Sequence, residues 1–145
     1  MKKLLFTLFA TLCTITSLLA EERVIDKGSL PKEAQRFIST HYVGDKISIA
    51  TAERGMFDAD YKVILTSGVK IEFDQKGNWT EIECKRNSHV PMAVVPTKIA
   101  KYVSQKFPKS RIMQIERDKR HVELELDNGM ELKFNTKGEL IKIDN

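Results

Sequence analysis

Hydrophobic and polar residues follow the same order twice along this chain, over residues 30–82 and again over residues 95–143. In each stretch, apolar residues first recur at the spacing of a helix and then alternate with polar residues at the spacing of strands. The second stretch lacks four residues, near positions 55–58 of the first. Because self-similarity along a chain indicates a repeated structural unit, the sequence predicts an α+β fold built as a tandem repeat.

Each repeat is expected to begin with a helix. Pro31 and Pro96 stand where a helix tolerates proline, in its first turn, and Pro108 ends the second helix. Each helix has an apolar stripe that must be buried. The stripes are formed by Leu30, Ala34, Phe37, Ile38 and Tyr42 in the first repeat, and by Val95, Ile99, Tyr102, Val103 and Phe107 in the second.

Four antiparallel strands, arranged as a meander, are expected after each helix. They cover residues 46–53, 61–65, 69–73 and 79–84 in the first repeat, and 111–117, 121–126, 130–134 and 140–143 in the second. The three-residue loops 66–68 and 127–129 end in glycine, which is typical of a type I turn followed by a bulge. The helices are expected to pack on one face of the sheet. The pattern leaves open whether the two repeats share a continuous sheet.

Residues 1–20 have the features of a secretory signal peptide. Lys2 and Lys3 precede an uncharged apolar stretch that ends in a small residue, Ala20. The predicted domains are then the signal peptide 1–20, a first repeat over 21–84, a linker over 85–94 and a second repeat over 95–145. We expect a periplasmic or secreted protein with no transmembrane segment after cleavage.

Charge and cysteine content narrow the classes of partner. Without Lys2 and Lys3 the chain has 22 basic residues against 20 acidic ones, a net charge of +2, and no basic stripe typical of nucleic-acid binding. Cys84 is the one cysteine after residue 20, so no intramolecular disulfide can form. Its strand position favours a small buried hydrophobe, and a dimer linked through Cys84 is the alternative.

No catalytic or metal-binding motif is recognisable. His41, His89 and His121 share no metal-ligand spacing with one another or with Cys84. Nucleophile elbows, phosphate loops and dinucleotide fingerprints are not found in the sequence. We therefore predict a protein that is not an enzyme, with no cofactor, no metal site and no catalytic residues.

The sheet face opposite the helices is the candidate binding surface. It is mostly charged, and Trp79 is an aromatic exception of the kind that anchors protein interfaces. Trp79 could equally pack at the edge of the core, because the turn at Gly77 could shift the strand parity by one residue. The predicted partner-binding residues are Lys62, Ile64, Lys70, Glu72, Trp79, His121, Glu123, Lys133 and Leu140, and the same parity adds Glu81, Glu125, Glu131 and Lys142 to this face.

The second repeat also resembles a known family. It combines Val95-Pro96, Tyr102-Val103, Phe107-Pro108, Asn128-Gly129 and a later Gly138. This series is similar to that of the PepSY-like, beta-lactamase-inhibitor-like secreted proteins of Gram-negative bacteria. The resemblance implies tandem units like those of beta-lactamase inhibitory protein, which presents an open sheet face to an enzyme. The related PepSY domains are thought to restrain peptidases. No catalytic residues carry over.

Three functions are compatible with these features. The first hypothesis is a non-catalytic periplasmic module that binds an envelope protein, such as a peptidase or another hydrolase, through the open sheet face and inhibits or modulates it. The alternative is a carrier that holds a small ligand or lipid between helices and sheet. A hydrolase is the least favoured, because no spacing brings a nucleophile and a base together.

Overall fold

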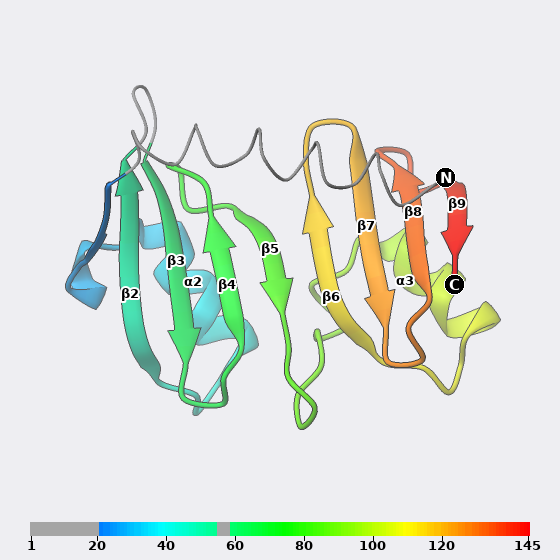
Figure 1. Cartoon of the computed structure of the whole chain (residues 1–145), viewed down its shortest axis with the longest axis horizontal. Helices are drawn as coiled ribbons and strands as arrows, with labels where there is room; N and C mark the ends of the chain where they lie inside the picture. Colours follow the sequence, from blue (N-terminus) through cyan, green and yellow to red (C-terminus); the bar gives the residue numbers. More distant parts are fainter. Residues whose placement is uncertain (1–20, 55–58) are drawn as a thin grey trace, which may run out of the picture.

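The computed structural model describes residues 21–54 and 59–145, and the predicted signal peptide lies outside these residues. One antiparallel sheet with nine strands in sequential order, β1 to β9, dominates the described chain (Figure 1). Its strands are β1 (Glu21–Val24), β2 (Ile47–Arg54), β3 (Ala59–Leu65), β4 (Lys70–Phe73), β5 (Trp79–Glu83), β6 (Ile112–Arg117), β7 (His121–Leu126), β8 (Glu131–Asn135) and β9 (Leu140–Asp144).

The predicted fold class is wrong. The described chain is not a tandem of two units, each with one helix packed on its own four-stranded meander; it has two α-helices and a single nine-stranded sheet. Two features produce this difference. The strand β1 precedes the first helix and pairs with β2, and β5 pairs with β6 through Ile82 opposite Ile115. Sequence periodicity identifies strands, but it does not reveal which strand edges meet.

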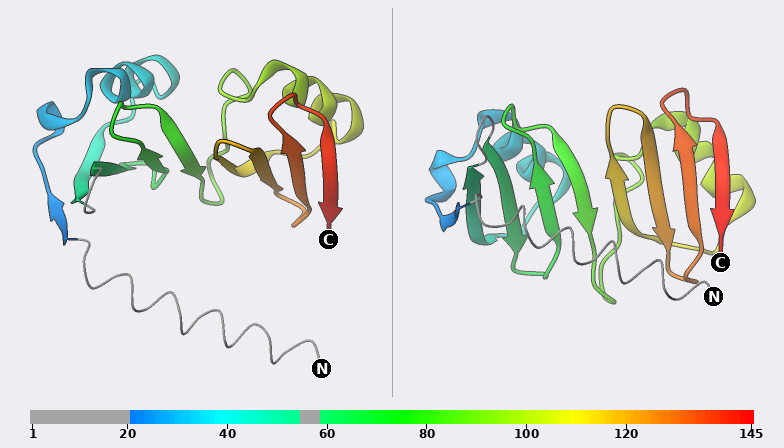
Figure 2. Two further views of the ribbon diagram at one scale, coloured as in Figure 1. Left: turned by 90° about the horizontal axis from the view of Figure 1, so that it is seen from above. Right: turned by 45° about the horizontal axis from the view of Figure 1, so that its top comes forward.

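The helices α2 (Lys32–His41) and α3 (Thr97–Lys106) lie on the same side of the sheet, as Figure 2 shows. A short 3-10 helix, η2 (Lys27–Ser29), precedes α2. Two edge-to-face ring contacts join helices to strands: Phe37 lies 5.8 Å from Phe73, and Tyr102 lies 5.5 Å from Phe134, between ring centroids. Both phenylalanines of the sheet are fully buried, so this side of the sheet holds the core.

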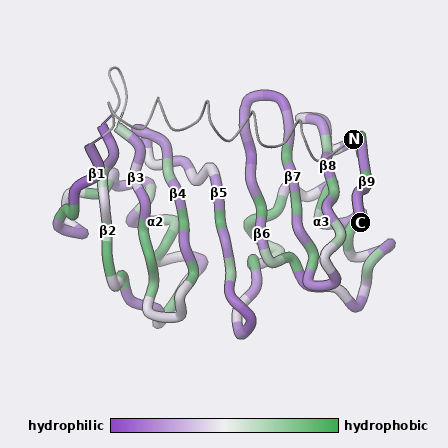
Figure 3. The backbone as a smooth tube through the Cα atoms, viewed as in Figure 1, coloured by the Kyte–Doolittle hydropathy of each residue, from purple (hydrophilic) through white to green (hydrophobic). Residues whose placement is uncertain are grey.

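The strand residues alternate between the two sides of the sheet. Figure 3 shows hydrophobic and hydrophilic positions following one another along the strands. In β7, for example, Val122, Leu124 and Leu126 are buried, whereas Glu123 and Glu125 are exposed. Since successive side chains of a strand point to opposite faces, the buried set faces the helices and the charged set forms the other face.

The two predicted hairpin turns are confirmed. The Leu65 amide donates to the Val69 carbonyl over 2.9 Å, and Leu126 and Met130 make the same contact in the second hairpin. Gly68 and Gly129 have φ values of 89° and 85°. These angles lie in the left-handed region that glycine adopts without strain, as the bulge requires.

The connection between β5 and α3 is tied to the sheet. The amides of Cys84 and Val90 donate to the carbonyls of Met113 and Ile112, each over 2.8 Å. Val90 is fully buried, so the segment predicted as a linker, residues 85–94, carries a core residue. Cys84 is buried, and this burial raises the pKa of its thiol to about 11. The side chain is therefore a small core residue, as one of the two interpretations proposed.

Candidate interaction surface

The side chains that face away from the helices form what we call the open face. Strand pairing arranges them in two rows that cross the sheet from β2 to β9. The first row is Thr51, Lys62, Glu72, Glu81, Glu116, Glu123, Lys133 and Lys142. The second row is Ile49, Ile64, Lys70, Glu83, Gln114, Glu125, Glu131 and Asp144.

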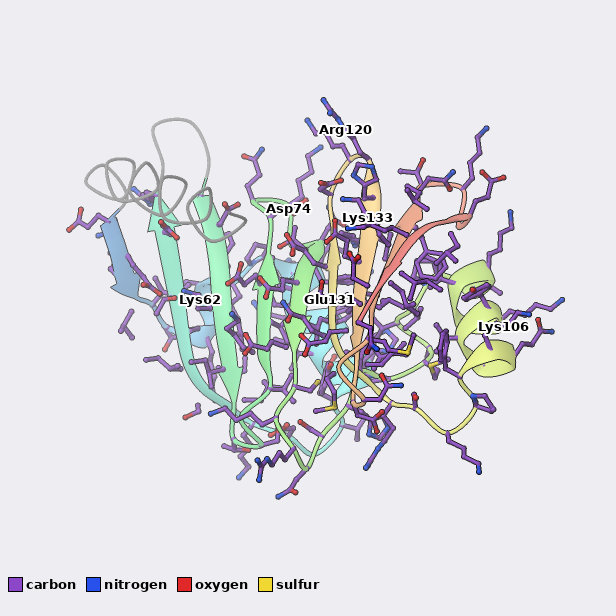
Figure 4. All side chains as sticks on the ribbon, turned by 45° about the vertical axis from the view of Figure 1, so that its right-hand side comes forward. Lys62, Asp74, Lys106, Arg120, Glu131 and Lys133 are labelled. Atoms are coloured by element: carbon purple, nitrogen blue, oxygen red, sulfur yellow. The ribbon has the colours of Figure 1, made fainter. Side chains whose placement is uncertain are left out.

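The open face is acidic although the chain is basic. Its two rows hold eight carboxylates against four lysines, whereas residues 21–145 have two more basic than acidic side chains. Figure 4 shows Lys62, Glu131 and Lys133 on strands of the sheet, while Lys106 extends from α3. The excess of carboxylates on this face therefore does not follow from the net charge of the chain. It follows from which strand positions the fold turns toward the open face.

Lys70 organises the charges in the first half of the open face. Its Nζ lies 2.8 Å from a Glu83 carboxylate oxygen, 3.7 Å from Glu72 and 3.8 Å from Glu81. The contact with Glu83 is the main cause that raises the pKa of Lys70. Burial, followed by repulsion from Glu72, raises the pKa of Glu81. One lysine therefore offsets several carboxylates that crowd one another across the strands.

In the second half of the open face, fewer carboxylates are paired with a lysine. A depression of about 370 Å³ lies over β6–β9 and is lined by open-face residues. Lys133 pairs with Glu123 at 2.6 Å, and Lys142 pairs with Asp144 at 2.6 Å. The three other carboxylates of the depression make no ion pair within the described residues; they are Glu116, Glu125 and Glu131. This part of the face is therefore complementary to a positively charged surface.

Trp79 and Leu140 lie on the helix side of the sheet. A register shift separates Trp79 from Glu81 in β5, and another separates Leu140 from Lys142 in β9, so both residues have the other parity: Trp79 opposes the buried Phe73, and Leu140 opposes the buried Phe134. Trp79 is only 6% exposed, and the Arg117 guanidinium stacks 3.9 Å from its ring centre. Arg117 also donates from Nε to the Trp79 carbonyl over 2.8 Å. Of the two placements considered for Trp79, the structure has the one at the edge of the core, because a bulge after the Gly77 turn changes the parity.

The other predicted residues are on the open face. Register places Lys62, Ile64, Lys70, Glu72, Glu123 and Lys133 in the two rows. His121 has the same strand parity as Glu123 and opposes Asn135. The structure therefore brings seven of the nine predicted residues to one surface.

Sequence reasoning missed the contribution of β6. Gln114 and Glu116 lie at the middle of both rows, where β6 joins the two halves of the sheet. Strict alternation along β6 puts Gln114 on the same side as Ile112, which is buried. Gln114 and Glu116 were therefore not assigned to the open face. A register shift between Ile112 and Gln114 resolves the conflict. The alternation of Gln114, Ile115 and Glu116 was the available signal.

The described residues hold no group of three or more His, Cys, Asp or Glu side chains placed to bind a metal ion. Helices long and apolar enough to cross a membrane are likewise not found among residues 21–54 and 59–145.

Comparisons with known proteins agree with the architecture. Residues 59–142 match the model of a family described as "putative beta-lactamase-inhibitor-like, PepSY-like". A solved periplasmic protein of the DUF2874 family from Bacteroides vulgatus is 46% identical, with a TM-score of 0.82 over 86% of this chain and 98% of that one. No curated protein matches the sequence.

Two further solved structures are similar. A protein from Bacteroides thetaiotaomicron described as a "calcium-regulated periplasmic protein" is 43% identical, with a TM-score of 0.81 over 86% of this chain and 97% of that one. A periplasmic protein of unknown function from Bacteroides vulgatus is 33% identical, with a TM-score of 0.80 over 86% of this chain and all of that one. These relatives confirm the predicted periplasmic location.

Proposed function

This chain belongs to the PepSY-like family, and from that premise we propose that it is a non-catalytic periplasmic protein that binds another envelope protein through its open face. The observation that carries the proposal is the segregation of charge. Carboxylates outnumber lysines two to one on the open face of a chain whose other residues are net basic. Such a surface steers and orients a partner of the opposite charge.

The proposed partner presents a cationic surface and, at some distance from it, a small apolar area. Glu116, Glu125 and Glu131 supply carboxylates without an ion pair among the described residues. Ile49 and Ile64, which oppose each other on β2 and β3, are 38% and 36% exposed and offer apolar contact area in the first half of the open face. The family description, inhibitor-like, supports a hydrolase or peptidase as the class of partner.

Two other functions have less support. A carrier needs space between helices and sheet, but the ring contacts of Phe37 with Phe73 and of Tyr102 with Phe134 occupy that layer. The relative described as calcium-regulated suggests a response to calcium. Calcium takes six to eight oxygen ligands, and no acidic cluster of the described residues is arranged to hold a metal ion, so the proposal does not include calcium binding.

In-cell photo-crosslinking tests the proposed surface. A photoreactive amino acid replaces Ile64 on the open face or, as a control, Arg36 on the exposed side of α2. We expect a defined cross-linked species from position 64 and none from position 36. The activity of the captured protein is then measured with and without purified chain.

The triple variant Glu116→Gln, Glu125→Gln, Glu131→Gln provides the charge test. Neutralising three carboxylates should weaken capture at least about tenfold, because each rim charge contributes to association with a cationic partner. Glu33→Gln on α2 is the matched control. Equal capture from positions 64 and 36, or undiminished capture by the triple variant, would contradict the proposal.

A further inference from the structure

The two edges of the sheet differ in how they are protected against pairing with another strand. Both edge strands are exposed along their whole length. β1 is short, and Glu21, Glu22 and Arg23 make up three of its four residues, which is how natural sheets block an edge. β9 instead exposes apolar side chains: Leu140 is 37%, Ile141 52% and Ile143 42% exposed. The β9 edge is therefore open to a further strand.

The charges at the β9 edge are arranged unfavourably within one molecule. Lys142 of β9 lies directly opposite Lys133 of β8, and Asp144 lies directly opposite Glu131. Like charges directly opposite each other destabilise a strand pair. The ion pair of Lys142 with Asp144 at 2.6 Å relieves this only in part, since both side chains are largely exposed. A strand with the reverse order of charges on the free side of β9 would relieve both repulsions.

We propose that β9 pairs antiparallel with β9 of a second copy of this chain, so that two sheets join edge to edge in a symmetric dimer. The favoured register places Ile143 opposite Ile143 of the second copy. Lys142 then lies opposite Asp144 of the second copy, and Asp144 opposite its Lys142. This pairing keeps faces matched, because Lys142 and Asp144 share the open face whereas Ile143 opposes the buried Leu132.

The neighbouring registers are disfavoured. If the two-fold axis passed through residue 142 or residue 144 instead of residue 143, Lys142 would lie opposite Lys142 or Asp144 opposite Asp144, and these like charges would repel. If one copy slipped by a single residue along the other, Ile143 would lie opposite a charged open-face residue, Lys142 or Asp144. The register shift at Leu140–Ile141 leaves the segment from Lys142 to Asp144 regular, so this segment can form the ladder. The charges of β9 therefore favour one register for pairing with a second copy of this chain.

Charge-swap variants test the dimer and its register together. The chain is expressed from its full sequence, purified from the periplasm and studied by analytical ultracentrifugation up to about 300 µM, since edge interfaces are small and of modest affinity. Lys142→Asp and Asp144→Lys should each weaken self-association at least about tenfold, because each creates two like-charge pairs. An equimolar mixture of these two variants should form a heterodimer, since one copy then offers two aspartates and the other two lysines.

The double variant Lys142→Asp, Asp144→Lys should regain the wild-type dimer. Ile143→Lys should abolish the dimer, and circular dichroism reports whether each variant is folded. A wild-type chain that stays monomeric over the whole range overturns the proposal. So does a mixture of the single variants that fails to associate, or a dimer that none of the substitutions at Lys142, Ile143 and Asp144 weakens.

Discussion

At the scale of single residues, the open face is a set of carboxylates held in register by strand pairing. Glu81 is central, because it lies opposite Glu72 on one side and Glu116 on the other. Gln114 donates from Nε2 to a Glu81 carboxylate oxygen over 2.8 Å, which fixes the side chain among like charges. The burial of Glu81 and its acidic neighbours raise the pKa of this carboxyl, so its charge opposes folding at neutral pH.

Replacing Glu81 with glutamine is expected to stabilise the protein at neutral pH. Because the folded-state pKa of Glu81 is raised, the folded chain binds more protons than the unfolded chain between the ordinary glutamate pKa and the raised one. Stability falls as the pH rises through that window. Glutamine keeps an acceptor for Gln114 and removes the charge. We expect a gain of less than about 1 kcal/mol in the free energy of unfolding, since the site is partly hydrated.

Urea titrations across a pH series measure this effect. The gain from Glu81→Gln should shrink as the pH falls below the ordinary range for a glutamate, about pH 4, where the wild-type carboxyl is protonated in both states. Glu33→Gln on α2 should show no such gain, because Glu33 pairs with Arg36 at 3.3 Å. A gain from Glu81→Gln that does not depend on pH would contradict this account.

At the scale of elements, tight turns hold the helices against the sheet. The turn between β4 and β5 is stabilised by Asp74, which accepts hydrogen bonds from the amides of Lys76 and Asn78, each over 2.9 Å. Gly77, at φ +87°, touches the start of α2. A Cβ added to Gly77 would lie 2.8 Å from the Ala34 amide nitrogen and 2.8 Å from the Pro31 Cβ. The turn therefore fixes where α2 begins on the sheet.

Gly77→Ala is expected to cost about 3 kcal/mol of unfolding free energy, because it adds a clash with backbone to the strain of positive φ. Gly44→Ala is the matched control. Gly44 has φ +83° but meets nothing within 4 Å, so it should lose only about 1 kcal/mol. Thermal and urea unfolding of both variants measure the difference. Equal losses of unfolding free energy in the two variants would show that the close contact of Gly77 with α2 does not contribute to stability.

At the scale of the whole molecule, β5 and β6 make one sheet out of two halves. Their ladder pairs Ile82 with Ile115, and both side chains are fully buried. The connecting segment reinforces this junction through the backbone bonds of Cys84 and Val90 to β6. Both rows of open-face residues cross the junction, through Glu81 and Glu116 in the first row and through Glu83 and Gln114 in the second. A partner bound there would contact both halves at once.

This continuity predicts that both halves unfold together. Ile115→Ala removes buried volume at the junction and should cost about 2–5 kcal/mol of unfolding free energy. Native-state hydrogen exchange should then show the same loss in the amides of β3 and β4 as in those of β7 and β8. A loss confined to β6 and β7 would mean that the halves unfold separately.

The sequence by itself determined eight of the nine described strands, the two described α-helices, the two glycine hairpin turns and the polarity of most open-face positions, because these follow from local periodicity and backbone conformation. It left the side of Trp79 open and misplaced Leu140, because a bulge puts the residues before it on the opposite side from the one that strict alternation predicts. Tertiary structure alone decided that β5 pairs with β6, that β1 joins the sheet and that β6 brings Glu116 among the other carboxylates. Both of these pairings join strands that are separated along the chain by a helix, so no tight-turn signal in the sequence marks them as neighbours.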